Sequence, residues 1–409
     1  MTVIHTSDWH LGAKLHEQDR AEEHAQFLSS LVSIIEQEQA DVLVISGDIF
    51  DMRQPGPAAQ ALYYNFLADV DRCACCKKVI VTAGNHDSSS MLAAAGQALK
   101  RLGVEVVAKA SEDVGKEVVV LENTDGTPAL VIAAVPFMND GELSNLARAA
   151  GIEAETTAEK LAGGFRAHYQ AVIAAAKEKA HGAPILVTGH CTVAGAKVSD
   201  SRSERGRTVG GLEAYEDGAF DGADYVALGH LHIPQQIGNT NRIAYCGSPL
   251  QMSFSEVDQE KYVNIVKFGV KSGDPIDFAV APIDANVPLK QFEGSAESIR
   301  AMVIALISDK PEKVYLSIRV TEGEGELAGF WSEIDAMVQG TGIRLLLKEN
   351  ARPHAPLGAG LAAAPEQQLS AMSPLQVATL RINEETDLSQ EEREGYIQMV
   401  EKVIGEVEV

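Results

Sequence analysis

The chain has 409 residues, enough for two or three domains, and its 45% hydrophobic and 22% charged residues are ordinary for a soluble globular protein. Its 34 basic and 58 acidic side chains give a formal net charge of -24, which argues against a protein whose surface is basic enough to hold nucleic acid by itself. A phosphate-bearing substrate must therefore be attracted by local charge, by a bound metal or by a partner subunit.

The cysteines and the absence of targeting segments predict a cytoplasmic protein that does not enter a membrane. Three of the five cysteines crowd into residues 73–76, a spacing too tight for a disulfide framework, so we expect reduced thiols. The first strand is expected to begin within three residues of Met1, which leaves no room for a signal peptide. No apolar run reaches the roughly 18 residues that a membrane span needs.

From residue 1 to about 280, segments of strand character alternate with segments of helical character. The predicted helices cover 20–38, 57–71, 91–102 and 152–180. The predicted short strands cover 104–107, 117–121 and 130–135, and two strands of antiparallel character cover 242–246 and 262–268. This succession of strands and helices, with more strands in its second half, predicts a two-sheet α/β sandwich.

Around Pro282 the pattern changes to a compact unit with its own elements. Its predicted strands cover 289–292, 314–320 and 343–348, and its predicted helices cover 296–308 and 327–339. A Pro/Ala/Gly-rich stretch and a short tail with two helix starts follow. The predicted division is a core of residues 1–280, a small α+β capping domain of 281–350, a linker of 351–365 and a helical tail of 366–409.

Five apolar strand-like runs each end in a short cluster of Asp, Asn or His. The central run, 41–46, ends in Gly47-Asp48. Open α/β sheets place their ligand sites at the carboxyl ends of parallel strands. The side chains at the five ends include Asp8, His10, Asp48, Asn85, His190, His230 and His232. Each cluster alone is weak evidence for a metal site, but five of them in one chain predict a site for divalent transition metals.

Two ions about 4 Å apart would share one bridging carboxylate, and Asp48 on the central strand is the natural candidate. The other side chains form two sets, Asp8, His10 and His232 for one ion and Asn85, His190 and His230 for the second. Two ions bring about four positive charges against two ligand carboxylates, so the pocket would be locally cationic and able to bind a phosphodiester.

These clusters resemble the five motifs of the calcineurin-like metallophosphoesterases. They read Asp8-Trp9-His10, Gly47-Asp48-Ile49-Phe50-Asp51, Gly84-Asn85-His86-Asp87, Gly189-His190 and Gly229-His230-Leu231-His232. Within that superfamily, the longer strings at 7–12, 209–213 and 245–250 resemble the bacterial SbcD family, the nuclease subunits of SbcCD complexes. The resemblance covers the whole chain.

The resemblance implies a DNA nuclease with two manganese ions, active as an ATP-dependent double-strand exonuclease and a single-strand endonuclease. It would act on DNA ends and hairpins in DNA repair, recombination and replication. Its implied partner is a coiled-coil ATPase of the SbcC type, within a heterotetramer that contains a homodimer of this chain.

The motifs also assign two residues that are not metal ligands. His86 would contact the scissile phosphate or protonate the leaving oxygen. Asp51 stands where archaeal and eukaryotic relatives usually carry a histidine. Phosphatases of the superfamily carry Asp there and pair it with the histidine of the Gly-Asn-His motif, which suggests that Asp51 orients His86.

Two other functions stay open. A small-substrate metallophosphodiesterase or phosphatase would use the same motif residues, and only the capping domain and the tail favour DNA. A non-catalytic scaffold is disfavoured, because such relatives lose ligands or the catalytic histidine, and here all of these residues are present.

Two further segments are predicted to make contacts. Arg202, Arg205 and Arg207 form the densest basic cluster near a ligand and would follow the DNA backbone, although a solvated loop is an equal alternative. The tail carries apolar stripes at helical spacing, which predict docking into a groove of the partner ATPase; packing against the capping domain is the alternative.

Overall fold

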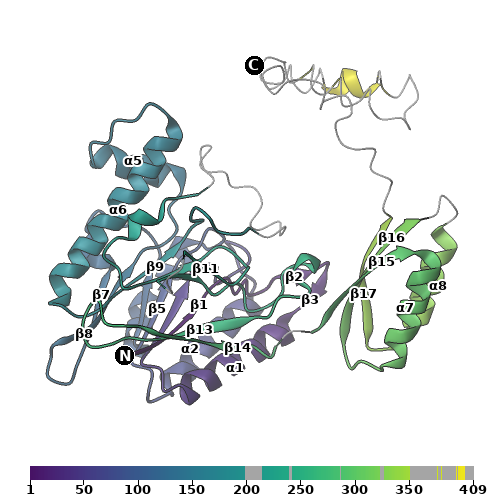
Figure 1. The fold of residues 1–409 in the computed structure, drawn as a ribbon, viewed down its shortest axis with the longest axis horizontal. Helices are drawn as coiled ribbons and strands as arrows, with labels where there is room; N and C mark the ends of the chain where they lie inside the picture. Colours follow the sequence, from purple (N-terminus) through teal and green to yellow (C-terminus); the bar gives the residue numbers. More distant parts are fainter. Residues whose placement is uncertain are drawn as a thin grey trace.

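Two six-stranded sheets packed face to face form the larger part of the chain (Figure 1). The computed structural model describes residues 1–198, 214–238, 242–285, 287–322 and 327–350, and in the tail residues 375, 379, 393 and 395–400. Helices cover the outer face of each sheet, and apolar side chains of both sheets meet between them. The predicted two-sheet α/β sandwich is therefore confirmed.

In the first sheet, the carboxyl ends of three parallel strands that carry predicted ligands meet at one edge. The strands run in the order β14 (Asp277–Pro282), β13 (Tyr262–Lys267), β1 (Thr2–Thr6), β4 (Val42–Ser46), β5 (Lys78–Thr82) and β6 (Val104–Val107). Strands β1, β4, β5 and β6 are parallel, and β13 and β14 are antiparallel additions. All of β4 is buried, because helices α1 (Ala21–Gln37) and α2 (Pro57–Asp71) cover one face and the second sheet covers the other.

The second sheet brings two more strand ends to the same region. Its order is β11 (Gln235–Ile237), β12 (Ile243–Tyr245), β10 (Tyr225–Gly229), β9 (Ile185–His190), β8 (Pro128–Ala134) and β7 (Val118–Glu122). The strand predicted at 242–246 is antiparallel to β11 but parallel to β10, so its predicted antiparallel character is only half right. The reason is that β11 and β12 form a hairpin, which turns the chain back into the direction of β10.

The helices differ from the prediction where capping groups set their ends. The predicted helix at 152–180 is α6 (Thr157–Ala180), which begins after Thr156, whose side chain and Glu159 form a capping box. A second capping box, Asn139 with Glu142, starts α5 (Asp140–Ala149), which was not predicted. The predicted helix at 91–102 is split into α3 (Ser89–Ala94), α4 (Gly96–Leu99) and the short η1 (Lys100–Leu102).

Hydrogen bonds tie the two sheets together directly beneath the strand ends. The Ser46 hydroxyl lies 2.8 Å from the Thr188 hydroxyl and donates to the Ala227 carbonyl at 3.0 Å. His5 on β1 lies 3.0 Å from the Tyr225 hydroxyl on β10. These buried contacts fix how the carboxyl edge of one sheet lies against that of the other.

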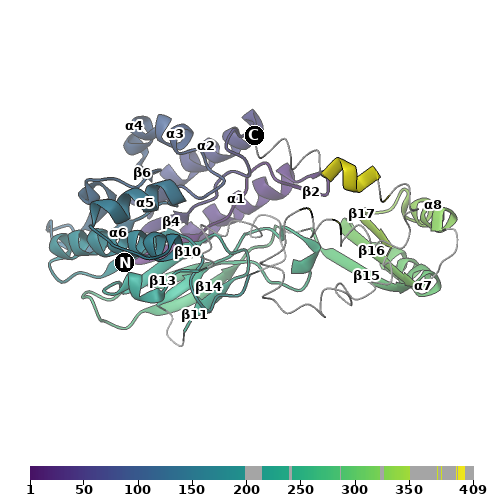
Figure 2. The same cartoon turned by 90° about the horizontal axis from the view of Figure 1, so that it is seen from above.

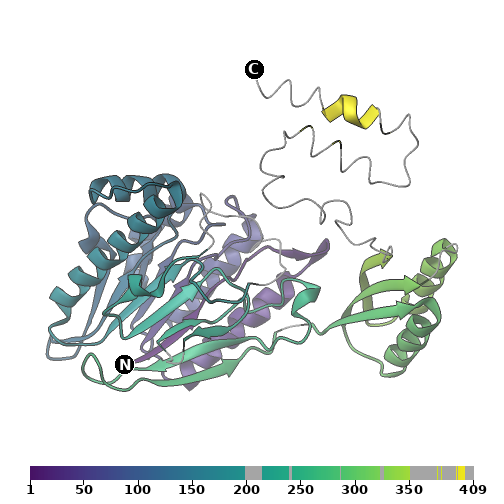
Figure 3. The same cartoon turned by 45° about the horizontal axis from the view of Figure 1, so that its top comes forward.

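A three-stranded parallel sheet with two helices on one face follows the sandwich (Figure 3). Its elements are β15 (Leu289–Ser295), α7 (Ala296–Ser308), β16 (Val314–Glu322), α8 (Leu327–Val338) and β17 (Ile343–Asn350). Figures 1 and 2 show this unit at the end of the molecule opposite α5 and α6. It contacts the sandwich through Leu289 and Tyr315, which pack on Leu15 and Phe254. The Tyr315 hydroxyl also donates to Glu23 at 2.9 Å.

Several predicted segments fall outside the described residues. They are Arg202, Arg205, Arg207, the linker 351–365 and most of the tail. Within the tail, residues 395–400 are helical, in agreement with the predicted helical tail. In the part of the chain that the structure describes, no helix combines the length and the hydropathy needed to cross a membrane. The short elements β2 (Lys14–Leu15), β3 (Gln18–Asp19), η2 (Val114–Glu117), η3 (Asp217–Phe220) and η4 (Phe254–Glu256) complete the fold.

Candidate active site

All seven predicted metal ligands and His86 lie at the carboxyl ends of β1, β4, β5, β9 and β10 or in the loops that follow them. Asp8 and His10 follow β1, Asp48 follows β4, Asn85 and His86 follow β5, His190 ends β9, and His230 and His232 follow β10. Most of these side chains are buried: Asp8 and His10 have no exposed surface, and Asp48, Asn85, His190 and His232 expose 4% or less. Buried polar groups at this density need charge partners or a metal.

The first donor set has the spacing of ligands around one ion. The Nε2 atoms of His10 and His232 lie 3.2 Å apart. Two nitrogens held about 2.1 Å from the same ion, at right angles, would lie about 3 Å apart. One ligand atom from each of Asp8, His10 and His232 lies within 4.8 Å of the others. This set therefore fits a divalent cation.

The second donor set gathers around Asn85, and Asp48 lies between the two sets. The Asn85 Oδ1 lies 3.0 Å from His190 Nε2 and 3.0 Å from His230 Nδ1. The Asp48 Oδ2 lies 3.4 Å from His190 Nε2 and 3.6 Å from His10 Nε2. The Asp48 carboxylate thus lies between the two donor sets, where a bridging carboxylate would contact both ions.

Neighbouring groups fix the direction in which each ligand points. His190 Nδ1 donates to the Ser46 carbonyl at 2.9 Å, which leaves Nε2 for a metal. Asp8 accepts hydrogen bonds from the Ser7 hydroxyl and, at 2.9 Å, from the backbone N–H of His230. The first motif is therefore linked to the last, although the two are far apart in the sequence.

His86 and Asp51 are arranged differently from the metal ligands. His86 is half-buried; its Nδ1 donates to the backbone carbonyl of Asp51 at 2.8 Å, and its backbone N–H donates to Asp48 Oδ1 at 2.8 Å. The Asp51 carboxylate lies 3.4 Å from His10 Nδ1 instead. Asp51 thus contacts His86 through a main-chain atom that any residue would offer, while its carboxylate lies beside a ligand of the first set.

The ligand loops have an unusual backbone. Asp8, His10, Asp48 and His230 have φ angles of 52°, 44°, 50° and 99°, in the left-handed region that side chains rarely adopt. Such residues cost about 1–3 kcal/mol each, so the surrounding structure must hold them. Backbone hydrogen bonds do so here: Asp8 donates to Gly47 at 3.0 Å and His10 donates to Asp48 at 3.0 Å. Gly84 is required beside Asp48, because a Cβ there would collide with the Asp48 carboxylate.

Asp87 is a positioning residue that the sequence interpretation missed. Its buried carboxylate accepts hydrogen bonds from the backbone N–H groups of Gly84 at 2.8 Å, Ile49 at 3.2 Å and Phe50 at 3.1 Å. It therefore joins the loop that carries Asp48 to the loop that carries Asn85. Its place in the Gly84–Asp87 string was visible in the sequence, but a carboxylate that binds backbone cannot be told from a metal ligand by spacing alone.

Comparison with known proteins gives the family of this chain. A sequence model of calcineurin-like phosphoesterases matches residues 1–234, and one described as the type 5 capsule protein repressor C-terminal domain matches residues 286–386. The SbcD subunit of the SbcCD nuclease from Escherichia coli K12 is 32% identical over 399 residues, 96% of this chain and 96% of that protein. The chain belongs to the SbcD family. The SbcD proteins of Rhodobacter capsulatus (30% identity, 91% of this chain, 92% of that protein) and Bacillus subtilis (33%, 72% and 73%) are similar to it as well.

Membership of the SbcD family, together with the match to the calcineurin-like phosphoesterases, makes this chain a metal-dependent phosphodiesterase and a nuclease. The predicted enzyme class is therefore confirmed. The paired clusters of buried Asp and His side chains supply the donor atoms that a divalent metal needs.

The ionisation of the ligand side chains follows from burial and from the charge of Asp48. Burial lowers the pKa of His10 and His190, but the Asp51 carboxylate beside His10 and the Asp48 charge beside both rings outweigh it and raise each pKa to about 9. Burial opposes the charge on Asp48, yet His190 and His10 hold the pKa of that carboxyl well below its usual range. Without metal, each donor set therefore holds one imidazolium beside a central carboxylate.

We expect metal binding to this site to release protons and to strengthen as the pH rises. Each ion must displace the proton of one histidine, His10 or His190, whose pKa of about 9 keeps it charged at pH 7. The apparent affinity for the ion at His190 should therefore rise about tenfold per pH unit between pH 6.5 and 8. The affinity for the ion at Asp8 and His10 should rise more steeply near pH 7, because burial also raises the pKa of Asp8 to about 7. Calorimetric titrations with Mn²⁺ in two buffers of different ionisation enthalpy would count the protons. Equal heats in both buffers and a flat pH dependence would contradict the prediction.

Proposed function

We propose that this chain is the manganese-dependent, two-metal nuclease component of an SbcCD-type complex. The observation that carries the proposal is the Asp48 carboxylate, whose Oδ2 lies 3.6 Å from His10 Nε2 and 3.4 Å from His190 Nε2, between two donor sets. In the proposed assignment, Asp8, His10, Asp48 and His232 hold one ion, and Asp48, Asn85, His190 and His230 hold the other. Manganese suits this mixture of imidazole and oxygen donors, whereas magnesium prefers oxygen donors alone.

The proposed mechanism divides the work between the ligands and His86. When bound, the ions supply Lewis acidity to the phosphate and activate water for in-line attack. His86 Nδ1 donates to the Asp51 carbonyl at 2.8 Å, so Nε2 is the ring atom that can contact the scissile phosphate or protonate the leaving oxygen. The Asp51 carboxylate, 3.4 Å from His10 Nδ1, orients that ligand.

The proposed substrate is DNA, and the proposed partner is an SbcC-type coiled-coil ATPase. The support is that the similar proteins are named as parts of SbcCD nucleases and that the match spans 96% of the Escherichia coli protein. We propose ATP-dependent exonuclease action on double-strand ends and endonuclease action on single strands and hairpins, within a heterotetramer that contains two copies of this chain. The net charge of -24 makes a partner that helps to hold DNA physically reasonable.

The proposed domains and DNA contacts follow the sequence prediction. We propose that residues 1–280 are the nuclease domain, 281–350 a capping domain, 351–365 a linker and 366–409 a docking tail. Arg202, Arg205 and Arg207, which lie outside the described residues, are proposed to contact the DNA backbone.

The test of the proposed function is a cleavage assay on linear duplex DNA with the full chain. It is run with Mn²⁺, with Mg²⁺ and after chelation, each with and without the ATPase and ATP. Cleavage that needs Mn²⁺ and is enhanced by the ATPase with ATP supports the proposal. Hydrolysis of small phosphodiesters or phosphomonoesters without any cleavage of DNA would instead assign a small-substrate enzyme.

Removal of the tail after Asn350 is expected to abolish binding of the ATPase while leaving the nuclease site intact. The cut follows β17, so it removes no strand or helix of the three-stranded unit. In the tail helix, Met399 is 62% exposed and Ile397 and Val400 are half-buried, so this short helix presents apolar surface for a partner.

Co-purification with the ATPase and the manganese content of the isolated protein measure the two parts of this prediction. A second variant separates the helix from the rest of the tail: the full chain with Ile397→Asp and Val400→Asp should also lose the ATPase. A truncated chain that still forms the complex would assign the docking site elsewhere.

A further inference from the structure

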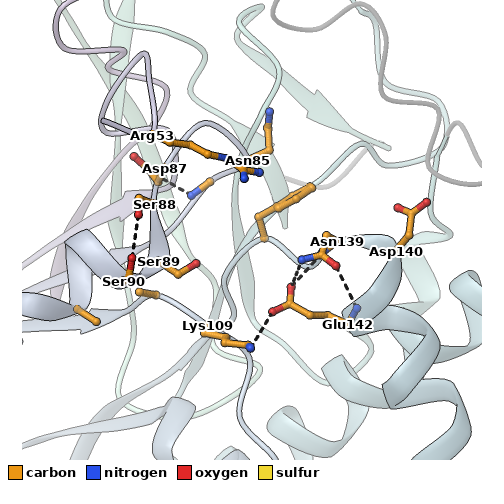
Figure 4. Close-up of a pocket in the computed structure, with 14 residues that line it drawn as sticks. Arg53, Asn85, Asp87, Ser88, Ser89, Ser90, Lys109, Asn139, Asp140 and Glu142 are labelled. Carbon is orange, nitrogen blue, oxygen red and sulfur yellow. Dashed lines mark hydrogen bonds and ion pairs between the residues drawn. The ribbon is translucent and has the colours of Figure 1, made fainter. Parts of the chain in front are cut away.

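A pocket of about 810 Å³ lies beside the metal ligand Asn85 (Figure 4). Asn85 and Asp87 form part of its wall. The loops that carry Arg53 and Phe137, helix α3, the residues after β6 and the start of α5 supply most of the rest. This volume is within the range of small-molecule sites, about 300–1,000 Å³. The seven predicted ligands explain only one of its lining residues, Asn85.

Phe137 gives the pocket an aromatic wall next to the metal site. Its ring is half-buried, lines the pocket and meets the ring of His190 edge-on, with centroids 6.2 Å apart and an interplanar angle of 85°. Its backbone N–H donates to the Ala83 carbonyl at 2.8 Å, which fixes it to the loop that carries Asn85. A rigid aromatic ring with accessible surface is the kind of platform on which nucleic-acid bases stack.

The polar groups of the pocket separate into a cationic end and an end where two carboxylates accompany one lysine. The exposed Arg53 extends towards Asn85, as Figure 4 shows, so a positive charge lies at the end nearest the metal ligands. At the other end, Lys109 pairs with Glu142 at 3.7 Å, Glu142 also accepts from the Asn139 amide at 2.9 Å, and the exposed Asp140 adds a second carboxylate. The Asp87 carboxylate is occupied by three backbone N–H groups. A phosphate fits the first end and an uncharged group fits the second.

We propose that this pocket is a subsite for the base of one nucleotide that flanks the scissile phosphate. Phe137 stacks on the base, and Arg53 contacts a phosphate of the same strand. The subsite accepts any base, because stacking uses the ring face that all bases share. The proposal rests on the proposed nuclease function and adds the requirement that the strand be unpaired at this nucleotide.

The test compares DNA strands that differ only in one base. Each strand carries phosphorothioates at all but one linkage, and the nucleotide on the 5′ or 3′ side of that linkage is either normal or abasic. With Mn²⁺-loaded full chain, the abasic nucleotide should lower kcat/KM by about 5- to 150-fold at one of the two positions. Phe137→Leu, which keeps apolar volume without a stacking face, should lower cleavage of the normal strand to the abasic level. The ratio between normal and abasic strands should then fall to about 1.

The ratio separates stacking from mere support of His190, because a structural defect lowers cleavage of both strands equally. Phe137→Tyr should restore the wild-type ratio. Phe278→Leu, the same change at a half-buried ring on β14, should leave the ratio unchanged. A wild-type ratio in Phe137→Leu, or no abasic effect at either position, would overturn the subsite alone. Absence of any DNA cleavage by the wild type would overturn the proposed function and the subsite with it.

Discussion

Replacement of Asp48 by alanine is expected to abolish metal binding and DNA cleavage together. Asp48 is the carboxylate between the donor sets, 3.6 Å from His10 and 3.4 Å from His190, so its loss removes a ligand from both proposed ions. Loss of one preorganised charge-stabilising group typically costs about 100- to 1,000-fold in rate. Loss of both ions should therefore lower the rate of cleavage by more than ~1,000-fold, because the nucleophile and the charge stabilisation disappear at once. Metal content after dialysis against Mn²⁺ and the rate of duplex cleavage measure the two effects.

The Asp48 variant should remain folded. Asp48 is one of the charges that raise the pKa of His10 and His190, so without it these buried rings lose protons more readily and leave less uncompensated charge. Asp48→Asn is the sharper variant, because its amide oxygen can still accept the backbone N–H of His86. Asp217→Ala, at an exposed position in η3, is the matched control that should keep metal and activity. Metal-dependent cleavage at the wild-type rate in Asp48→Asn would remove Asp48 from the site.

The position of the site could be predicted from the sequence because parallel strands share one carboxyl edge. Each of the runs before Asp8, Asp48, Asn85, His190 and His230 is apolar and short, so each predicts a buried strand with its polar end at that edge. The prediction required no long-range information, and the structure places these ends together. The same rule explains why the α/β sandwich could be predicted correctly from the sequence.

What could not be predicted depends on contacts between distant loops. The Asp51 carboxylate lies 3.4 Å from His10 Nδ1, a contact between two motif loops that the spacing within either motif does not predict. By its position in the motif Asp87 could be another metal ligand, yet its carboxylate accepts hydrogen bonds from three backbone N–H groups. Phe137 lies in a stretch without a motif. Its place beside the site is visible only in the structure, where its ring centroid lies 6.2 Å from that of His190, a residue far along the chain.

Replacement of His86 by glutamine is expected to remove most of the turnover while both metals stay bound. The His86 ring is held by the Asp51 carbonyl at 2.8 Å, and the contact of residue 86 with Asp48 is made by its backbone N–H, which glutamine keeps. Loss of a general acid typically lowers the rate by about 100- to 10,000-fold, and we expect a decrease in kcat of that size. Single-turnover cleavage at saturating enzyme would measure it, with manganese content determined on the same sample.

The manganese content decides between two roles for His86, because its ring also lies in a cluster with His10 and Asp51 whose ligand atoms are within 4.8 Å of one another. If His86 is a ligand, His86→Gln should lose manganese and its activity should partly return at high Mn²⁺ concentration. If His86 acts on the substrate, added metal restores nothing, and a substrate with a leaving group that needs no proton should be cleaved at nearly the wild-type rate. His181→Gln, at an exposed position after α6, is the matched control for the chemical change and should keep both metal and rate. The second pattern is the expected one, because His86 is more exposed than the buried ligands around Asp48.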